Sequence, residues 1–334
     1  MDSKMSRRTF HKLGLGTTVL GVAGTAGPPL PPGAKAIGAN DTIRVAFIGV
    51  GSRGCQLMDV FKKCKLVEIV GMCDADSAVL DKAAAKFAPK AAKEKDFRKL
   101  LERDDVDAVV IATPDHWHAI QMVEACKAGK DVYFEQPVSS TLQESYIMNE
   151  AAKKYNRIVQ CGCVGRSSPF YLKMFNERIL DKVSRISVVR CGYVNNMAWG
   201  GIGRKSRIDP PATLDWDLWL GPRYQPYQEN ITPYKFRWWS DYSSQIASQG
   251  VHMFDTIRWL MRERDAQSVC AMGGRWVFGD DRTIPDTMAV CYQFNSGRLL
   301  TFNFFETSGN PIMATDEKYQ PLGDIEFRGV NGTL

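Results

Sequence analysis

Ile43-Arg44-Val45-Ala46-Phe47-Ile48-Gly49-Val50-Gly51-Ser52-Arg53-Gly54 is an apolar strand that runs directly into a complete G-x-G-x-x-G turn. A helical pattern from Cys55 to Lys63 follows the turn. A second apolar run, Leu66–Met72, then leads to Asp74, which lies twenty residues after Gly54. Strand, glycine turn, helix, strand and acid in this order are typical of a dinucleotide-binding βαβ unit.

The three glycines and the acid have separate predicted roles. Gly49 allows the tight turn, Gly51 lets the backbone approach a pyrophosphate, and Gly54 lets the helix pack close to the strand. The helix N-terminus offers free N–H groups and a partial positive charge to the phosphates. We expect Asp74 to bind the adenosine ribose and to favour NAD over NADP, whereas Arg53 is near enough in sequence to contact a 2′-phosphate. A glycine turn without a ligand is the weaker alternative, because the whole context is present.

The N-terminus carries a predicted export signal. Residues 6–12, S-R-R-T-F-H-K, match the twin-arginine pattern, and an apolar segment, 13–26, follows. This segment is too short and too rich in Gly and Thr for a membrane span of about 20 residues, so we expect no span in the mature chain. Ala34-Lys35-Ala36 is an A-x-A cleavage site, which predicts a signal peptide and linker over 1–36 and a mature start near Ile37.

The signal has consequences for the cofactor. The twin-arginine machinery carries folded proteins, so a nucleotide would be bound in the cytoplasm, travel with the chain to the periplasm and be retained there. We therefore expect a tightly held cofactor that is recycled in place. The alternative for this segment is a disordered basic N-terminus.

The charge and the cysteine content argue against a nucleic-acid-binding, a metal-binding or a disulfide-rich protein. The chain has 43 basic and 37 acidic residues, a net charge of +6. Residues 1–36 contain five basic residues and one acid, which leaves only +2 for the rest, and we expect no nucleic-acid partner. The nine cysteines form no C-x-x-C metal pairs, so no metal site is expected. Because the chain would fold in a reducing compartment before export, no disulfide framework is expected either. Cys161 and Cys163 alternate in an apolar strand and are interpreted as a buried thiol pair.

The pattern divides the mature chain into two domains. Residues 41–163 alternate strands and helices, which predicts an α/β Rossmann domain with a doubly wound parallel sheet. Strands are expected at 66–72, 106–112, 131–134 and 157–163, helices at 79–87, 97–103, 119–128 and 142–155, and a loop at 113–118.

Residues 164–334 predict a C-terminal α+β domain with an open, mostly antiparallel sheet. Helices are expected at 170–180 and 253–261, strands at 183–193, 268–277, 287–295, 298–306 and 324–328, and turns at 295–297 and 330–332. Residues 333–334 begin a further strand, so the sheet is expected to be truncated at its C-terminal end.

Six motifs together give the chain a family resemblance. They are the G-V-G-S-R-G turn, T-P-D-H-W-H-A at 113–119, E-Q-P at 135–137, W-D-L-W-L-G-P at 216–222, F-R-W-W at 236–239 and G-V-H-M-F-D at 250–255. With them, nearly all of 43–334 resembles the Gfo/Idh/MocA oxidoreductases, most of all their exported bacterial branch. The resemblance implies a Rossmann domain and a second α/β domain that supplies the substrate site and an interface between copies in a homo-oligomer. It also implies NAD(P)-dependent chemistry at a carbinol carbon of sugars, inositols and related compounds.

The catalytic residues implied by the resemblance include two departures. His252 matches the family's general base, which takes the hydroxyl proton as hydride leaves. Gln136 stands where the family has the lysine of E-K-P, and Ser248 stands where it has the aspartate of D-x-x-x-H. Loss of such groups typically costs about 10²–10⁴ in rate. The Gln136–Pro137 peptide is expected to be cis, as the family pattern implies.

Further site residues follow from the same resemblance and from their places at strand ends. The expected cofactor contacts are Ser52, Thr113, Pro114, His118, Glu135 and Gln136, besides the glycines, Arg53 and Asp74. The expected substrate contacts are Arg166, Trp238, Trp239 and Asp255. For Arg166 a surface position is an equal alternative, and for the tryptophans a place in the core is the alternative.

The sequence therefore predicts an exported NAD(P)-dependent oxidoreductase that acts on a sugar or polyol by hydride transfer. A trapped cofactor also permits a closed cycle, such as bond cleavage through a keto-sugar. A second hypothesis is a cofactor-bound sensing or scaffold protein that has lost catalysis, which the residues at 136 and 248 suggest. A non-redox structural fragment is a third, suggested only by the abrupt end.

Overall fold

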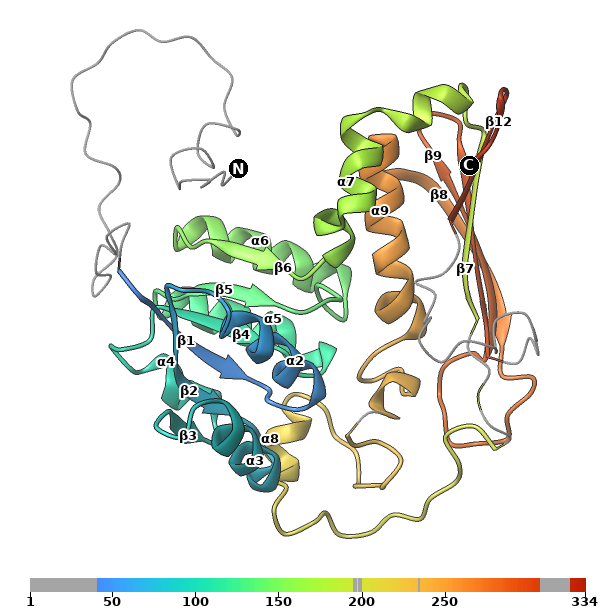
Figure 1. Cartoon of the computed structure of the whole chain (residues 1–334). Helices are drawn as coiled ribbons and strands as arrows, with labels where there is room; N and C mark the ends of the chain where they lie inside the picture. The colour runs from blue at the N-terminus through green and yellow to red at the C-terminus, as the bar shows by residue number, and fades with distance from the viewer. Residues whose placement is uncertain (1–40, 195–196, 198–199, 234, 307–324) are drawn as a thin grey trace, which may run out of the picture.

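The computed structural model describes residues 41–194, 197, 200–233, 235–306 and 325–334. The predicted signal peptide, 1–36, lies outside the described residues, and so does Asp324. The first domain is a six-stranded parallel sheet in the order β3-β2-β1-β4-β5-β6 (Figure 1). Its elements are β1 (Ile43–Ile48), α2 (Ser52–Phe61), β2 (Val67–Cys73), α3 (Ser77–Phe87), β3 (Ala92–Glu94), α4 (Phe97–Leu101), β4 (Ala108–Ile111), α5 (Asp115–Lys127), β5 (Asp131–Phe134), α6 (Leu142–Lys154) and β6 (Val159–Cys161).

Burial on both faces holds this sheet together. Alternate residues of β1 point into two separate cores, so Ile48 packs with Leu100 and Phe47 packs with Met58. Each of these four side chains is almost fully buried, which contributes about 2 kcal/mol apiece. The chain adds β2 and β3 on one side of β1 and then crosses over to add β4 on the other side. This reversal creates a topological switch point, where ligands bind in such sheets.

Two local predictions in this domain were wrong. The loop expected at 113–118 ends early, because α5 begins at Asp115 after Pro114 as N-cap. An acid in the first turn is favourable at the positive end of the helix dipole. Strand β3 was not predicted, because its three residues Ala-Lys-Glu have no apolar signal and pair only with β2 at the sheet edge.

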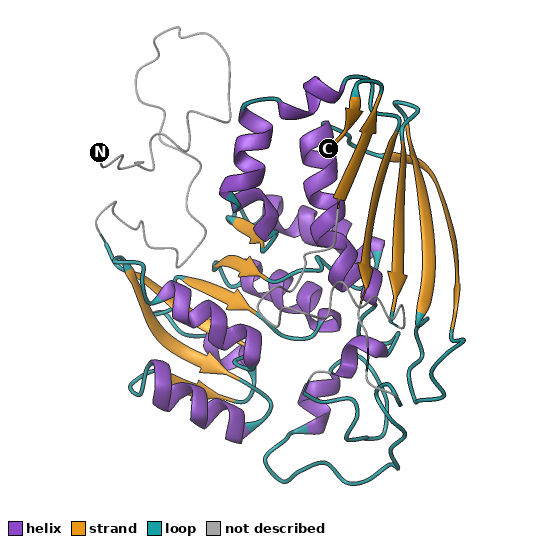
Figure 2. Ribbon diagram, turned by 45° about the vertical axis from the view of Figure 1, so that its right-hand side comes forward, coloured by secondary structure: helices purple, strands orange, loops and turns teal. Residues whose placement is uncertain are grey.

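The second domain is a six-stranded sheet in the order β12-β11-β7-β10-β9-β8, antiparallel except where β7 pairs with β10. Helices α7 and α9 cover one face, and the other face is turned away from the first domain (Figure 2). The mostly antiparallel sheet is confirmed. Its elements are α7 (Pro169–Asn176), β7 (Val188–Val194), α8 (Trp216–Leu220), α9 (Val251–Met261), β8 (Ala266–Gly274), β9 (Thr287–Phe294), β10 (Leu299–Phe305), β11 (Ile325–Gly329) and β12 (Gly332–Thr333).

One predicted strand of this sheet is shorter than expected. The strand expected from residue 183 starts only at Val188, because Ile179–Val183 forms a 3₁₀ turn. Three further short helical turns are described in this domain. They are η1 (Val164–Ser167), η3 (Lys235–Trp238) and the π-helical turn η4 (Ile246–Gly250), which continues directly into α9.

A long connection of the second domain reaches back to the first. Residues 209–233, here called the strap, contain α8 and lie against the carboxyl end of β2. The Ser77 N–H donates to the Thr213 carbonyl at 2.9 Å, and the Asp215 N–H donates to the Ala75 carbonyl at 2.9 Å. Asp76 and Leu214 form a β-bridge between these two hydrogen bonds. The strap therefore holds the two domains together beside the switch point.

Candidate functional site

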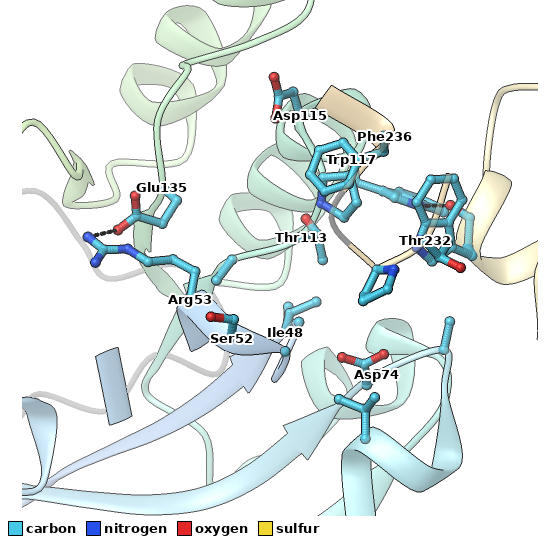
Figure 3. A pocket seen from close by; sticks show the side chains of 18 of the residues that line it. Ile48, Ser52, Arg53, Asp74, Thr113, Asp115, Trp117, Glu135, Thr232 and Phe236 are labelled. Atoms are coloured by element: carbon cyan, nitrogen blue, oxygen red, sulfur yellow. Dashed lines mark hydrogen bonds and ion pairs between the residues drawn. The ribbon is translucent and has the colours of Figure 1, made fainter. Parts of the chain in front are cut away.

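A cavity of about 790 Å³ lies between the carboxyl ends of the parallel strands and the second domain (Figure 3). This volume is within the range of small-molecule and cofactor sites. The glycine turn, the ends of β2, β4 and β5, the strap, and the η4–α9 junction all contribute to its wall. The sequence-predicted residues that line it are Gly49, Gly51, Ser52, Arg53, Asp74, Thr113, Pro114, Glu135, Gln136, Ser248 and His252.

The glycine turn has the geometry of a phosphate cradle. Gly49 has φ +83°, and a Cβ atom there would lie 2.7 Å from the Ala112 carbonyl carbon. A Cβ atom at Gly54 would lie 2.1 Å from the Gly49 carbonyl oxygen, so α2 approaches the turn too closely for any side chain. At Gly51, by contrast, no atom lies within 4 Å of a Cβ position, and no side chain caps α2. The open space and the free N–H groups fit a pyrophosphate.

Asp74 lies at the end of β2, where the sequence predicts a ribose contact. Its Oδ2 accepts a hydrogen bond from the Val50 N–H at 3.0 Å, and its Oδ1 accepts one from the Asp76 N–H at 3.1 Å. Burial raises the pKa of the Asp74 carboxyl to about 6. Each oxygen of a carboxylate keeps a lone pair for a further donor, so Asp74 fits two ribose hydroxyls.

Arg53 and Glu135 form an ion pair across the mouth of the glycine turn. Arg53 Nη2 lies 2.8 Å from Glu135 Oε1, and the Arg53 side chain points away from Asp74 (Figure 3). Arg53 also donates to Gln56 Oε1 at 3.1 Å. The structure therefore places Arg53 in the cavity wall but directs it towards the β5 end, rather than towards a 2′-phosphate on a ribose at Asp74.

The expected catalytic residues converge at the β5 end of the cavity. Ser248 in η4 and His252 in α9 lie one turn apart, and Gln136 follows β5 with a cis peptide to Pro137, as expected. His252 Nδ1 and Gln136 Oε1 are buried and have no hydrogen-bond partner among the described residues. Burial lowers the pKa of His252, whereas the carboxylate of Glu135 acts in the opposite direction. The imidazole is therefore neutral near pH 7 and can accept a proton.

The structure does not place His118 in the cavity wall, contrary to the expected cofactor contact. Its Nδ1 lies 2.7 Å from the Pro137 carbonyl oxygen and its Nε2 lies 2.9 Å from the Thr113 carbonyl oxygen. Both ring nitrogens therefore face carbonyl oxygens within hydrogen-bond distance. Because α5 begins at Asp115, the His118 side chain is turned inwards, where it joins the loops that follow β4 and β5.

The four expected substrate contacts also lie outside the cavity wall. Arg166 forms a bidentate pair with Asp255 at 2.7 and 2.8 Å, so these two side chains join η1 to α9. Trp239 is buried and donates to the Asn230 carbonyl at 3.2 Å. Trp238 donates to Glu306 Oε1 at 2.6 Å. Trp239 is a core residue and Trp238 is half-buried against the same cluster, which agrees with the alternative of a place in the core.

Other residues of the wall were not predicted from the sequence. Asp115, at the start of α5, accepts a hydrogen bond from the Ser243 hydroxyl, and burial raises the pKa of its carboxyl. Its place directly after a buried strand was the available signal. Trp219, Phe236 and Arg237 also line the cavity, from the strap and η3. Their motifs were identified, but no pattern in the sequence says which aromatic residue of the stretch faces a ligand.

The strap is joined to α5 by a shared acceptor. His116 Nε2 and Trp117 Nε1 lie 3.1 and 2.9 Å from the Trp219 carbonyl oxygen. Burial lowers the pKa of His116 to about 4.

The described part of the chain contains no cluster of three or more His, Cys, Asp or Glu side chains placed to hold a metal ion. None of its helices is long and apolar enough to cross a bilayer.

Part of the chain is similar to curated proteins of known sequence. A "Glycosyl hydrolase family 109 protein" of Shewanella baltica strain OS155 is 30% identical over 170 residues, which is 48% of this chain and 36% of that protein. A protein of the same name from Shewanella pealeana is 28% identical over 219 residues, which is 59% of this chain and 47% of that protein. The chain therefore spans less than half the length of these relatives.

Solved structures share the fold. The WlbA dehydrogenase of Chromobacterium violaceum, in complex with NADH and UDP-GlcNAcA, has a TM-score of 0.65 at 19% identity, over 87% of this chain and 72% of that one. The myo-inositol 2-dehydrogenase of Lactobacillus plantarum has a TM-score of 0.64 at 18% identity, over 88% of this chain and 76% of that one.

Family models match both domains. Residues 43–163 match the NAD-binding Rossmann fold of the oxidoreductase family, and residues 171–273 match its C-terminal alpha/beta domain. These two segments contain the cradle, the ends of the parallel strands and the η4–α9 junction, so the match includes the cavity wall described above. The chain belongs to the Gfo/Idh/MocA family of oxidoreductases.

Proposed function

We propose that the chain binds NAD in the cavity and catalyses hydride transfer at a carbinol carbon of a sugar, polyol or related carbohydrate. One observation carries this proposal. His252 Nδ1, Gln136 Oε1 and the carboxylate of Glu135 are buried in one wall of the cavity, and the first two atoms lack any protein partner among the described residues. Unpaired buried polar atoms are costly, so a ligand that donates hydrogen bonds is the expected occupant.

The placement of the cofactor follows from the sheet. Asp74 ends β2 and Gln136 follows β5, and three strand spacings, roughly 14 Å, separate these positions. A dinucleotide that binds its adenosine ribose at Asp74 and its pyrophosphate at Gly51 would extend across the switch point to β5. Gln136 and His252 would then be the residues beside its reactive ring. When bound, the nicotinamide supplies the acceptor for a hydride.

The chain's own residues supply the proton chemistry. The neutral imidazole of His252 accepts the proton of the substrate hydroxyl, while Gln136 and the Ser248 hydroxyl hold that hydroxyl in place. The imidazolium that forms is stabilised by the Glu135 carboxylate, whose position is held by Arg53. Ser248 stands where the family has an aspartate, and its hydroxyl carries no charge. Glu135 thus supplies the negative charge near His252 that Ser248 cannot supply.

The strap favours a retained cofactor. Leu214 and Leu218 of the strap line the cavity on the side of Asp74, and two backbone hydrogen bonds attach the strap to the first domain there. A dinucleotide would leave only after these contacts open. Retention agrees with the export signal expected from the sequence, because a periplasmic protein has no nicotinamide pool from which to replace its cofactor.

A redox-neutral cycle is a second candidate, and the names of the curated relatives favour it. An enzyme that oxidises a sugar carbon, cleaves the adjacent glycosidic bond and then reduces the same ring would act as a glycosidase without net consumption of NAD. The same three residues, His252, Gln136 and Glu135, would serve both hydride steps, so the proposed site is unchanged.

The test uses the full chain purified after export. Nucleotide released on denaturation is identified, absorbance at about 340 nm is followed with a panel of sugars and polyols, and release of a chromophoric aglycone is followed with glycosides. Net absorbance change supports the dehydrogenase, and aglycone release that depends on NAD supports the redox-neutral cycle. His252→Asn should lower either rate by about 10²–10⁴ without loss of NAD.

Two results would refute the proposal. No nucleotide in the purified protein and no binding of added NAD would exclude cofactor chemistry altogether. Bound NAD without turnover on any compound, and without gain in a Gln136→Lys, Ser248→Asp double variant, would instead support the sensing or scaffold hypothesis.

A further inference from the structure

Cys161 and Cys163 lie at the junction of the two domains and have no part in the proposed hydride chemistry. Cys161 is the last residue of β6, and the Cys163 N–H donates to the Cys161 carbonyl at 2.9 Å, so the chain turns between them. The two sulfur atoms are 4.0 Å apart. A turn, and not the strand alternation expected from the sequence, brings the thiols together, and both residues are only partly buried.

The surroundings make the two thiols unequal. The hydrogen bond between them lowers the pKa of Cys163, and the Arg166 guanidinium acts in the same direction, while Asp255 and Glu135 oppose it. The same hydrogen bond and burial raise the pKa of Cys161. Cys163 therefore ionises more readily than Cys161. Thiolates are the nucleophiles of disulfide exchange.

We propose that Cys161 and Cys163 form a thiol–disulfide modification site, which closes to an intramolecular disulfide by exchange with an external small-molecule or protein disulfide. Cys163 loses its proton to water, and the resulting thiolate attacks one sulfur of the external disulfide, forms a mixed disulfide and expels one thiolate. Cys161 loses its proton to water and attacks the Cys163 sulfur, which expels the second thiolate. The protein loses two electrons and two protons, and the external disulfide is reduced to two thiols.

Closure of this disulfide acts on the cavity through Gly162. A Cβ atom at Gly162 would lie 2.6 Å from the Tyr133 hydroxyl oxygen and 3.0 Å from Glu135 Oε1, so the turn is packed against both side chains. The sulfur atoms must approach from 4.0 Å to about 2.05 Å, which moves the turn. A small strained ring of this kind is also readily reduced again. Because Glu135 lines the cavity, and on the basis of the proposed function, oxidation weakens NAD binding.

The chemical test needs no cofactor. The full chain is incubated with glutathione disulfide, and the products are located by peptide mass spectrometry. We expect a loss of about 2 Da in the peptide that contains both cysteines. Cys161→Ser should trap a glutathione adduct on Cys163, and Cys163→Ser should leave Cys161 unmodified. No reaction at either residue, or an adduct on Cys161 in preference to Cys163, would overturn the proposal.

A second cysteine pair provides the matched control. Cys270 and Cys291 face each other across β8 and β9 in the antiparallel register. A Cys270→Ser, Cys291→Ser double variant should oxidise at Cys161 and Cys163 as fast as the unchanged chain. If this variant no longer oxidises, the reaction occurs at Cys270 and Cys291, and the proposal is overturned.

The coupling to the cavity is measured separately by calorimetric titration of NAD into the reduced and the oxidised protein. We expect about tenfold weaker binding after oxidation, reversed by dithiothreitol. Equal affinities in the two states would refute the coupling. An absence of NAD binding in both states would refute the proposed function, while the mass spectra would still decide the thiol chemistry.

Discussion

Alanine at Gly51 and alanine at Gly54 should have opposite effects, although the two glycines belong to one turn. At Gly54 the new Cβ atom would lie 2.1 Å from the Gly49 carbonyl oxygen, and it must move about 0.9 Å to reach 3.0 Å, the closest approach that real Cβ atoms make. The obstacle is backbone and cannot rotate away. Overpacking of this kind costs about 1–3 kcal/mol, and we expect about 3 kcal/mol of lost stability here.

At Gly51 nothing lies within 4 Å of the new Cβ atom, and φ −66° with ψ −156° is an extended conformation open to alanine. Loss of chain entropy in the unfolded state should make Gly51→Ala equally stable or more stable, by up to about 1 kcal/mol. The methyl group would occupy the space proposed for the pyrophosphate. Loss of two charge-assisted hydrogen bonds, at about 1.5–3 kcal/mol each, weakens NAD binding by about 100-fold or more.

Urea unfolding of the cofactor-free proteins measures the first effect, and calorimetric titration of NAD measures the second. The reasoning requires that Gly51→Ala separates the two, with stability retained and NAD binding lost. If Gly51→Ala unfolds as readily as Gly54→Ala, the open cradle is not as described. If it binds NAD as tightly as the unchanged chain, the pyrophosphate does not lie at Gly51.

Three further predictions concern single side chains. Because the pKa of Asp74 is raised to about 6 and the ribose requires its carboxylate form, NAD affinity should fall about tenfold per pH unit below pH 6, and Asp74→Asn should abolish this dependence. Burial lowers the pKa of His116 from 6.5 to about 4, so as the pH falls the imidazole takes up a proton first in the unfolded chain. The free energy of unfolding should therefore fall by up to about 3 kcal/mol between pH 6.5 and pH 4. His116→Gln should remove most of this pH dependence in urea unfolding. Arg166→Ala removes an ion pair in which the Arg166 side chain is half exposed, so it should cost about 1 kcal/mol or less by urea unfolding and leave the Kd for NAD within twofold. A larger loss of affinity would show that Arg166 contributes to the cofactor site.

Local chemistry explains why much of this protein is predictable. The Gly49–Gly54 turn needs backbone conformations and clearances that only glycine allows, so its function can be recognised from residue types and spacing alone. The apolar runs of β1 and β4 are buried on both faces, which requires a parallel sheet covered by helices. Asp74 follows from its fixed place at the end of the next strand.

Where a side chain points was decided only by the tertiary structure. His118 lies in a recognised motif, but a helix that starts four residues earlier than expected turns it away from the cavity and between two carbonyl oxygens. Arg166 and Asp255 neutralise each other, although they are 89 residues apart in the chain. No local pattern records such a partner, because the pairing depends on how η1 packs against α9.

The residues at 136, 248 and 252 were identified through the resemblance to a known family. The sequence by itself determined the dinucleotide cradle and the two-domain architecture. These depend on short-range sterics and on hydrophobic periodicity, which are written in consecutive residues. Only the tertiary structure decided that Glu135 lies near His252 at the β5 end of the cavity, that the strap attaches beside Asp74, and that a turn brings the sulfur atoms of Cys161 and Cys163 within 4.0 Å. Each of these features depends on contacts between separate elements of the fold. The burial and the charged surroundings at such contacts exist only in the folded chain.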